Sequence, residues 1–393
     1  MSGGISIKEL LKGVEVEWKP LSHGDNPVAE LRRGRVMSKI YLAENIGNYP
    51  VYSSQTANNG EIGKIDTFDF DEELVSWTTD GANAGTVFYR TGKFSITNVC
   101  GIIKINNESE LSYKFLYYWL EIEAKKHVYS GMGNPKLMSH QVSKILIPIP
   151  PLQIQSEIVR ILDNFSELTA ELTAELTAEL TARKKQYSYY RDTLLTFKDG
   201  EVKRKALYEI AQYSKNRIST KDIDDSNYIG VDNLLQNRAG KTSSNYVPTE
   251  GNLTKYFKND ILIGNIRPYL KKIWQSDCVG GTNGDVLVIH LTDNMVNPRY
   301  LYQVLADDKF FEYNMKHAKG AKMPRGNKEA ILKFQIPIPP IEEQERIISI
   351  LDKFDTLTNS ISEGLPKEIK LRQQQYEYYR NLLLTFPKQN VEL

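Results

Sequence analysis

Hydrophobic side chains recur at three- and four-residue intervals after residue 152, which is the pattern of an amphipathic helix. The apolar stripe comprises Ile158, Ile161, Leu162, Phe165, Leu168, Leu172, Leu176 and Leu180. Pro150-Pro151 precedes the pattern and Gly200 follows it, at positions where helices commonly begin and end. A continuous helix over 152–197 would be ~70 Å long at ~1.5 Å per residue. Such a helix cannot bury its stripe alone and needs a partner.

The same segment occurs twice, because residues 147–197 recur at 336–386 with a constant offset and no gap. Of the 51 paired positions, 25 are identical. The segments that precede the two copies, 22–146 and 208–335, share only scattered residues such as Thr97-Asn98 and Thr282-Asn283. The chain therefore alternates variable and constant blocks, an order that favours a pseudo-twofold object with two different surfaces.

The second copy contains Gly364-Leu365-Pro366, which should break or kink its helix. We expect the two constant segments to pack antiparallel as a strut between the variable domains. Two separate helical hairpins are the alternative.

The variable blocks have the pattern of α/β domains rich in strand and loop. Short apolar runs bounded by Gly, Asn and Asp predict strands at 87–89, 102–105, 261–263 and 286–289. Short helices rich in Tyr and Leu are expected at 111–120 and 300–305. The predicted fold is thus two globular α/β domains joined by two long antiparallel helices.

Composition sets broader bounds. The chain has 393 residues, 40% of them hydrophobic, and a net charge of +1, which is typical of a soluble protein with more than one domain. No run of eighteen apolar residues and no secretory leader is present, and the two cysteines, Cys100 and Cys278, are isolated. We therefore expect a cytoplasmic protein with reduced thiols. Each constant block carries a net charge of −2, which leaves +5 for the remainder of the chain.

Glycine- and asparagine-rich loops and clustered cations in the variable blocks are the candidate binding residues. Glycine permits close backbone approach, and Asn, Thr, Arg and Lys can bond to base edges or phosphates. Each loop taken alone could be an ordinary turn, and each Lys a solvated surface charge. The candidates for DNA binding are Thr79, Asn83, Arg90, Lys93, Asn134, Lys136, Arg267, Tyr269, Lys271, Lys272, Thr282, Asn283, Lys322 and Arg325.

A tetrapeptide, Thr-Ala-Glu-Leu, is repeated at 169–172, 173–176 and 177–180 inside the first constant block. One interpretation is an inert helical spacer, since Ala, Glu and Leu are good helix formers. The other is a ruler, because each copy lengthens a helix by ~6 Å and rotates the residues after it by ~40°. One DNA base pair turns a duplex by roughly 35°. The number of copies could therefore set the distance between two recognised half-sites.

Catalytic motifs are missing from the sequence. It contains no NPPY- or DPPY-type tetrapeptide of base methyltransferases and no glycine-rich GxGxxG fingerprint. Gly240-Lys241-Thr242 resembles the end of a P-loop, but Leu235 stands where its first glycine should be. The five histidines form no metal or triad spacing. We expect no active site and no bound metal.

Two variable blocks, two constant helical blocks that end in QYxYYR-x-x-LL-T-F, and the TAEL repeats resemble the specificity subunit of a type I restriction-modification system. The resemblance covers essentially the whole chain, and the TAEL tract is typical of the branch often called type IC. It implies target-recognition domains at 14–150 and 201–340 and conserved helical regions at 151–200 and 341–393.

The resemblance also implies partners and their chemistry. Each recognition domain would recognise one part of a split, asymmetric DNA target. The helices would form a coiled-coil spacer that docks two modification subunits, which restriction subunits join. S-adenosylmethionine, ATP and Mg²⁺ would be bound by those partners and not by this chain. The spacer and subunit-interface candidates are Leu168, Leu172, Leu176, Leu180, Tyr187, Tyr190, Tyr376 and Tyr379.

Individual base contacts do not follow from the resemblance, because recognition blocks diverge between family members. We expect Asn83 and Arg267 to contact base edges and Lys136 and Arg325 to contact phosphates. The competing hypothesis is a protein-interaction scaffold without nucleic acid, which the weak overall basicity favours.

Overall fold

The amphipathic pattern after residue 152 forms one uninterrupted helix, α5 (Leu152–Leu194), in a computed structural model that describes residues 11–131, 133–359 and 363–387. The second copy is divided into α10 (Ile341–Asn359) and α11 (Gly364–Leu383), as its Gly and Pro predict. Gly364 has φ +76°, and a Cβ on it would lie 2.6 Å from the carbonyl oxygen of Thr356. The break therefore needs glycine for both conformation and space.

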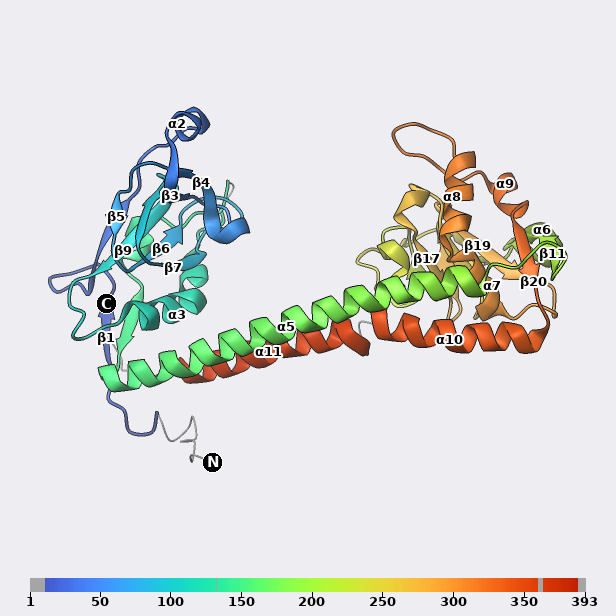
Figure 1. The fold of residues 1–393 in the computed structure, drawn as a ribbon. Coiled ribbons are helices and arrows are strands. Elements are labelled where there is room, and N and C mark those ends of the chain that lie inside the picture. The colour runs from blue at the N-terminus through green and yellow to red at the C-terminus, as the bar shows by residue number, and fades with distance from the viewer. Residues whose placement is uncertain (1–10, 132, 360–362, 388–393) are drawn as a thin grey trace. The chain divides into compact units, whose positions relative to one another are not determined.

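The described residues form two units, and each takes part of α5 (Figure 1). Unit 1 consists of Met1–Glu171 and Arg372–Leu393, and unit 2 of Leu172–Leu371. Each unit thus contains one variable block, the start of the helix that follows it, and part of the other constant block. Within the constant block predicted at 341–393, residues 360–362 and 388–393 lie outside the described residues.

Unit 1 is an α/β domain of short strands. Its elements before α5 are β1 (Glu17–Pro20), β2 (Ala29–Arg33), α2 (Lys39–Glu44), β3 (Ile46–Tyr52), β4 (Glu61–Ile65), β5 (Phe70–Asp71), β6 (Leu74–Thr78), β7 (Val87–Arg90), β8 (Lys93–Ile96), β9 (Cys100–Ile105), α3 (Tyr113–Glu123), α4 (Ser139–Val142) and β10 (Leu146–Ile149). They form a β1-β10 ribbon, a β2-β9-β6-β7 sheet and a β4-β3-β8-β5 sheet.

Unit 2 repeats much of this plan. Its elements between α5 and α10 are β11 (Lys203–Ala206), α6 (Leu207–Ile210), β12 (Ala211–Tyr213), β13 (Arg217–Ser219), β14 (Tyr228–Ile229), β15 (Asn252–Tyr256), β16 (Ile261–Gly264), β17 (Ile273–Gln275), β18 (Gly280–Thr282), β19 (Val286–Leu291), α7 (Pro298–Leu305), α8 (Asp308–His317), α9 (Lys328–Leu332) and β20 (Gln335–Ile338). The ribbon β11-β20 and the sheet β12-β19-β16-β17 match those of unit 1. The predicted strands at 87–89, 102–105, 261–263 and 286–289 are confirmed.

The second sheet of each unit differs at its outer strand. In both units a central strand, β8 or β18, has one parallel neighbour, β3 or β14, and one antiparallel neighbour, β5 or β15. Unit 1 adds β4 beside β3, whereas unit 2 adds β13 beside β15. Unit 1 also has an α-helix, α2, between β2 and β3, whereas the described residues between β12 and β14 in unit 2 contain no α-helix.

A buried glutamine fixes the recognition block of unit 1 to α5. The Gln155 side chain is fully buried, and its Nε2 donates to the carbonyl oxygens of Pro150 (2.8 Å) and Glu110 (2.6 Å). Its Oε1 accepts from the backbone N–H of Ser112 (3.0 Å), the residue that caps α3. A single side chain thereby satisfies three backbone groups and joins the start of α5 to the start of α3.

Unit 2 repeats this arrangement at the equivalent positions. Gln344 is also fully buried, and its Nε2 donates to the carbonyl oxygens of Pro339 (2.9 Å) and Met295 (3.0 Å). Its Oε1 accepts from the backbone N–H of Asn297 (2.8 Å), which caps α7. We call Gln155 and Gln344, with their three partners each, the glutamine sockets.

An aspartate eight residues after the glutamine makes a second link between the constant helix and the recognition block in each unit. Asp163 accepts from Tyr118 (2.8 Å) and pairs with Lys114. The equivalent Asp352 accepts from Arg299 (2.8 Å) and Gln303 (2.7 Å). The two links hold one face of α3 or α7 against the constant helix.

Apolar burial completes the joint. Ile158 and Leu162 are fully buried in the core of unit 1, which they share with Leu383, Leu384 and Phe386 from the end of the other constant block. Ile347 and Leu351 are the equivalent buried residues of unit 2. Each recognition block therefore shares one hydrophobic core with its helices.

The constant segments pack on each other within each unit. In unit 1, Phe165 lies 5.5 Å from Tyr379 between ring centroids, and Ser166 Oγ donates to the Tyr376 hydroxyl (2.9 Å), an antiparallel register of α5 and α11. In unit 2, Phe354 of α10 stacks on Tyr190 (5.3 Å) and Tyr187 (5.9 Å) of α5. Phe165 with Tyr379 and Phe354 with Tyr190 are the same pair in the two copies. No described helix is long and apolar enough to cross a bilayer.

Candidate nucleic-acid interface

Each unit carries a short hairpin that presents a cation. In unit 1 the backbones of Tyr129 and Lys136 exchange two hydrogen bonds of 2.8 and 2.9 Å. In unit 2 Lys319 and Arg325 exchange the same two bonds, at 2.9 and 2.8 Å. The segment between α8 and α9, which contains the second hairpin, projects from unit 2 on the side opposite α10 (Figure 1). Lys136 and Arg325 are thus equivalent exposed cations on equivalent hairpins.

A second loop bonds to each hairpin at the same point. The N–H of Gly81 donates to the carbonyl oxygen of Pro135 (3.0 Å) in unit 1. In unit 2 the N–H of Arg267 donates to the carbonyl oxygen of Pro324 (2.7 Å). The loop after β6 therefore corresponds to the loop after β16. The structure therefore brings the loop of Asn83 next to Lys136, and Arg267 next to Arg325. The two pairs are equivalent, and the members of each pair are far apart in the sequence.

Most of the predicted contact residues are accessible in this arrangement. The exposed ones are Asn83, Lys93, Asn134, Lys136, Arg267, Tyr269, Lys322 and Arg325. Arg325 forms an ion pair with Asp285 (2.9 Å) that a phosphate could replace. The guanidinium of Arg267 has no hydrogen-bond or ion-pair partner within the described part of the chain. Such an exposed and unpartnered cation is free to bond to DNA.

The backbone of the unit 2 loop is strained. Arg267 has φ +52° and Lys271 has φ +51°, and the two flank a short 3-10 turn at Pro268–Leu270. Non-glycine residues in the left-handed region cost about 1–2 kcal/mol each and occur preferentially at functional sites. The loop is thus held in a costly backbone conformation, which favours a binding role for it.

Arg90 is a wrong prediction, because only 3% of its surface is exposed. Its Nε donates to Ser76 (3.1 Å) and its Nη1 to the carbonyl oxygen of Asn59 (2.8 Å), and its guanidinium lies 3.5 Å from the ring centroid of Tyr52. Burial lowers the pKa of Arg90 to about 10. The charge therefore holds the loop at Asn59 from inside unit 1 and cannot contact DNA.

Thr79 and Thr282 are also wrongly predicted as side-chain contacts, since both are fully buried. Thr79 donates to Asp80 (2.6 Å), and Thr282 donates to the carbonyl oxygen of Ile229. Asn283 is half-buried, and its Oδ1 accepts from the N–H of Asp285 (3.1 Å). The hydrogen bonds of these side chains are made within the loops and strands, so the residues stabilise the loops and do not offer these groups to a ligand.

Two lysines of the unit 2 loop have internal partners. Lys271 pairs with Asp308 (2.6 Å), and Lys272 donates to the carbonyl oxygen of Val231 (2.7 Å). Burial raises the pKa of Asp308, but bonds from Lys271 and the charge of Arg238 outweigh burial and bring it below its ordinary value. Asp308 is therefore ionised at neutral pH. Both lysines hold the loop to the rest of unit 2, and their charged groups are engaged in these internal contacts.

Sequence reasoning missed Arg33 and Arg35, which extend the surface of unit 1. Arg33 is exposed and donates to Thr79 Oγ1 (3.2 Å) and to the carbonyl oxygen of Asn98 (3.2 Å). The N–H of Asn98 donates to the carbonyl oxygen of Arg35 (3.0 Å). The signal was available, since residues 32–39 hold four cations in eight positions. Lys93 lies nearby, 4.7 Å from the ring of Phe68, which adjoins the partner of Arg35, Asp69.

The helix candidates divide into buried and exposed residues. Tyr187, Tyr190, Tyr376 and Tyr379 take part in the helix–helix contacts described above. Leu176 and Leu180 are half-buried, whereas Leu168 and Leu172 are 54% and 36% exposed. Tyr189 and Tyr378, at equivalent positions, are 66% and 63% exposed. The helices therefore retain apolar surface that a further protein could cover.

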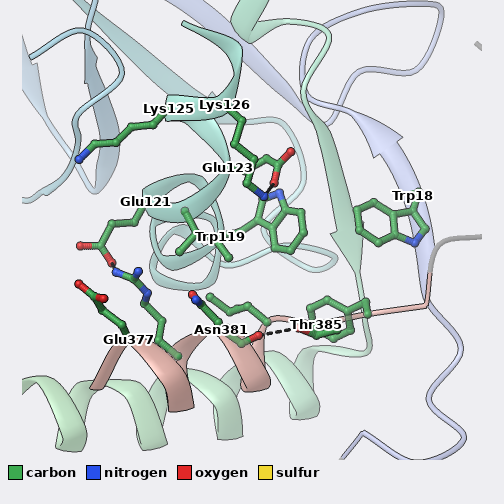
Figure 2. A pocket seen from close by; sticks show the side chains of 13 residues that line it. Trp18, Trp119, Glu121, Glu123, Lys125, Lys126, Glu377, Asn381 and Thr385 are labelled. Carbon is green, nitrogen blue, oxygen red and sulfur yellow. Dashed lines mark hydrogen bonds and ion pairs between the residues drawn. The ribbon is translucent and has the colours of Figure 1, made fainter. Parts of the chain in front are cut away.

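A cavity of about 690 Å³ lies between α3, α11 and β1 in unit 1, as Figure 2 shows. Trp18, Trp119 and Phe386 contribute its apolar wall. The charged groups around it largely neutralise each other: Glu121 pairs with Arg380 (3.2 Å) and Glu123 with Lys126 (2.6 Å). No group of three metal-ligating side chains was found among the described residues. Lys125 and Glu377 also line the cavity.

Comparison with known proteins identifies relatives over the whole length. The family described as type I restriction modification DNA specificity domain matches residues 15–182 and 200–371. A type I restriction enzyme specificity subunit of Escherichia coli is 34% identical over 97% of both chains. A putative subunit of the same kind from Haemophilus influenzae is 34% identical over 97% of this chain and 98% of its own.

Solved structures share the fold at low sequence identity. The S subunit of a type I restriction-modification system from M. genitalium matches with a TM-score of 0.52 and 16% identity, over 96% of this chain and 98% of its own. A chain from a study of complex assembly and conformational transition in the type I R-M system matches with a TM-score of 0.62 and 13% identity, over 95% and 98%.

Proposed function

Since the chain belongs to the type I restriction-modification DNA specificity family, as a non-catalytic specificity subunit, we propose that each unit recognises one part of a split, asymmetric DNA target. The observation that carries the proposal is the repeated hairpin and loop, one set per unit, with different side chains at equivalent positions. A duplicated fold with two unlike surfaces suits a target with two unlike halves.

Within each surface, we assign different roles to the hairpin and the loop. Lys136 and Arg325 occupy equivalent positions, so a contact common to both halves, the phosphate backbone, suits them. The loops differ: Asp80 and Asn83 in unit 1 stand where unit 2 has Ile266 and Tyr269, next to Arg267. Arg267 suits the O6 and N7 acceptors of guanine, and Asn83 the N6 and N7 atoms of adenine.

The repeat also suggests how partners attach. The exposed Tyr189 and Tyr378, with Leu168 and Leu172, offer apolar helix surface for modification subunits, one for each repeat, which restriction subunits would join. Those partners would bind S-adenosylmethionine, ATP and Mg²⁺ and perform methylation and cleavage. A cytoplasmic location fits this assembly.

The three TAEL copies favour the type IC-like branch and a ruler function. They lie on α5, at the point where the helix passes from unit 1 to unit 2. Because one copy adds ~40° of rotation and one base pair roughly 35°, a change of one copy would rotate the two recognition surfaces nearly in step with the duplex.

Methylation mapping tests the proposed function. Cells that express the cognate methyltransferase subunit, alone or with this chain, are sequenced by a long-read method that detects modified bases. We expect a split motif of two short parts and a fixed gap only when the chain is present. A complex that forms but methylates no motif would contradict the proposal.

A further inference from the structure

Unit 1 exposes large apolar side chains on a segment that unit 2 lacks. Val36, Ile40 and Ile46 are 79%, 69% and 77% exposed, and α2, which lies among them, buries none of its residues. We call residues 35–46 the arm. Within unit 1, α2 lies on the side opposite the start of α5 (Figure 1). Three branched apolar side chains so far out of the core need an explanation beyond folding.

The arm is held in place by polar contacts. Ser38 Oγ accepts from the N–H of Tyr41 (3.0 Å) at the start of α2, and Asn45 Nδ2 donates to the carbonyl oxygen of Tyr41 (2.8 Å) at its end. Arg35 donates to the hydroxyl of Tyr41 (3.0 Å) and to Asp69 (3.1 Å). The arm is thus capped at both ends and joined to the domain by these polar residues and by the half-buried Leu42, which lies near Gly63 of β4, whereas Val36, Ile40 and Ile46 remain outside.

The arm is continuous with the candidate DNA surface. The carbonyl oxygen of Arg35 accepts from Asn98, whose own carbonyl oxygen accepts from Arg33. Arg33 in turn donates to Thr79, next to the loop that bonds to the Lys136 hairpin. The apolar side chains therefore stand at the edge of a surface that already suits phosphates, among the exposed cations Arg33, Arg35 and Lys39.

The corresponding part of unit 2, the described residues between β12 and β14, exposes no large hydrophobic side chain. Between β13 and β14 it has only a 3-10 turn at Thr220–Asp222, followed by Asp224 and Asp225. All three aspartates are exposed. The exposed Lys215, Arg217 and Lys221 balance these aspartates, so at this edge the two units differ in exposed apolar side chains and not in the sign of their charge.

We propose that the arm of unit 1 enters the minor groove beside the half-site that unit 1 recognises and partly unstacks a base step there. Val36 and Ile40 supply the apolar wedge, and Lys39 contacts a flanking phosphate, while Arg35 holds the arm in place through Tyr41 and Asp69. Apolar side chains flanked by cations are the chemistry by which proteins unstack and bend a duplex. The inference rests on the proposed function and extends it, because it adds a contact outside the recognised sequence on one side only.

The test uses the complex of the full chain with its methyltransferase subunit on duplexes that contain the mapped target. 2-Aminopurine is placed at successive steps flanking each half-site, and its fluorescence reports unstacking. We expect a rise on binding at a step beside the unit 1 half-site and none beside the other. The double variant Val36→Ser, Ile40→Ser should lose the signal and bind roughly tenfold more weakly.

Controls separate the possible failures. Val279→Ser removes a 45% exposed branched side chain from unit 2 and should leave both fluorescence and affinity unchanged. Lys39→Ala should lower the salt dependence of binding by about one counterion while the complex stays assembled. A wild-type complex that binds its motif without any flanking signal, or a double variant that no longer assembles with the methyltransferase, overturns the wedge and leaves the proposed function standing. A wild-type complex that binds no DNA overturns both.

Discussion

The two units are alike where they meet the helices and unlike where they face outward. Both have the glutamine socket, the aspartate link, the four-stranded sheet and the cation-bearing hairpin at equivalent positions. They differ in the outer strand of the second sheet, in the arm and in the loop that bonds to the hairpin. The contacts that fix a recognition domain to its helices are the same in the two copies, and the surfaces proposed to contact a target differ between them.

The difference also shows in the chemistry of the two loops. Unit 1 presents Asp80 and Asn83 on a loop with glycines, whereas unit 2 presents Arg267 from a strained left-handed backbone. An acidic and amide-bearing loop and an arginine loop suit different base edges. The comparison therefore predicts that a change in one unit alters one half of the target and leaves the other half alone.

The largest expected effect comes from shortening α5 between the two recognition blocks and leaving the blocks themselves unchanged. Deletion of one TAEL copy, residues 173–176, shortens α5 by ~6 Å. We expect methylation of the original target to be lost and a target with a gap one base pair shorter to replace it, while both half-sites keep their sequence. Affinity for the original target should fall by roughly three orders of magnitude.

A matched control replaces residues 173–176 with another four-residue helix-forming sequence, which keeps the length and removes the TAEL motif. It should leave the gap unchanged. If the gap between the half-sites changed when the TAEL sequence was replaced at constant helix length, the ruler hypothesis would be refuted.

The next largest effect is on stability, and substitution of a socket glutamine should destabilise only the unit that contains it. Gln155→Leu leaves two carbonyl oxygens and one N–H buried without partners, at a cost of about 3–5 kcal/mol in the free energy of unfolding of unit 1. Gln344→Leu should do the same to unit 2. Hydrogen exchange, read separately for peptides of each unit, measures the loss.

The control for the socket is Gln153→Leu, because Gln153 is exposed on the same turn of α5. It should change stability by less than about 0.5 kcal/mol. Equal loss of protection in both units after Gln155→Leu would show that the two units do not fold as separate cores.

The smallest effects are those of the two hairpin cations. Lys136→Ala and Arg325→Ala should each weaken binding equally for specific and random DNA and lower the slope of log affinity against log salt by about 0.9. Lys353→Ala, which removes an exposed cation on α10, should leave the slope unchanged. A sequence-dependent loss for Arg325→Ala alone would mean that this residue contacts bases.

Much of the fold was accessible from the sequence. The period of the apolar stripe gives α5, the Gly-Leu-Pro break separates α10 from α11, and the apolar runs give four of the strands. The pairing of the constant segments follows from their duplication, since two similar stripes complement each other. The glutamine sockets were not foreseen, because a Gln within a helix is ordinarily a surface residue and nothing local indicates three backbone partners.

The candidate site was predicted in part. The hairpin cations were named because Gly131, Pro135 and Lys136 match Gly320, Pro324 and Arg325, whereas the loops of Asn83 and Arg267 were named for their composition alone. Arg90 and Thr282 were misassigned because alternation in a short strand does not reveal which face is buried. The arm was missed because its cations fall in a stretch without a counterpart in the other half, so comparison of the repeats could not reveal it.

Recognition of one half-site by each unit is tested most sharply by methylation mapping of the Arg267→Ala chain, with Arg346→Ala on α10 as the control. We expect one part of the split motif to become degenerate at a guanine position, with about 1–3 kcal/mol of discrimination lost, while the other part and the gap stay unchanged. Loss of sequence preference in both parts, or a uniform loss of methylation with the motif intact, would contradict recognition of one half-site by each unit.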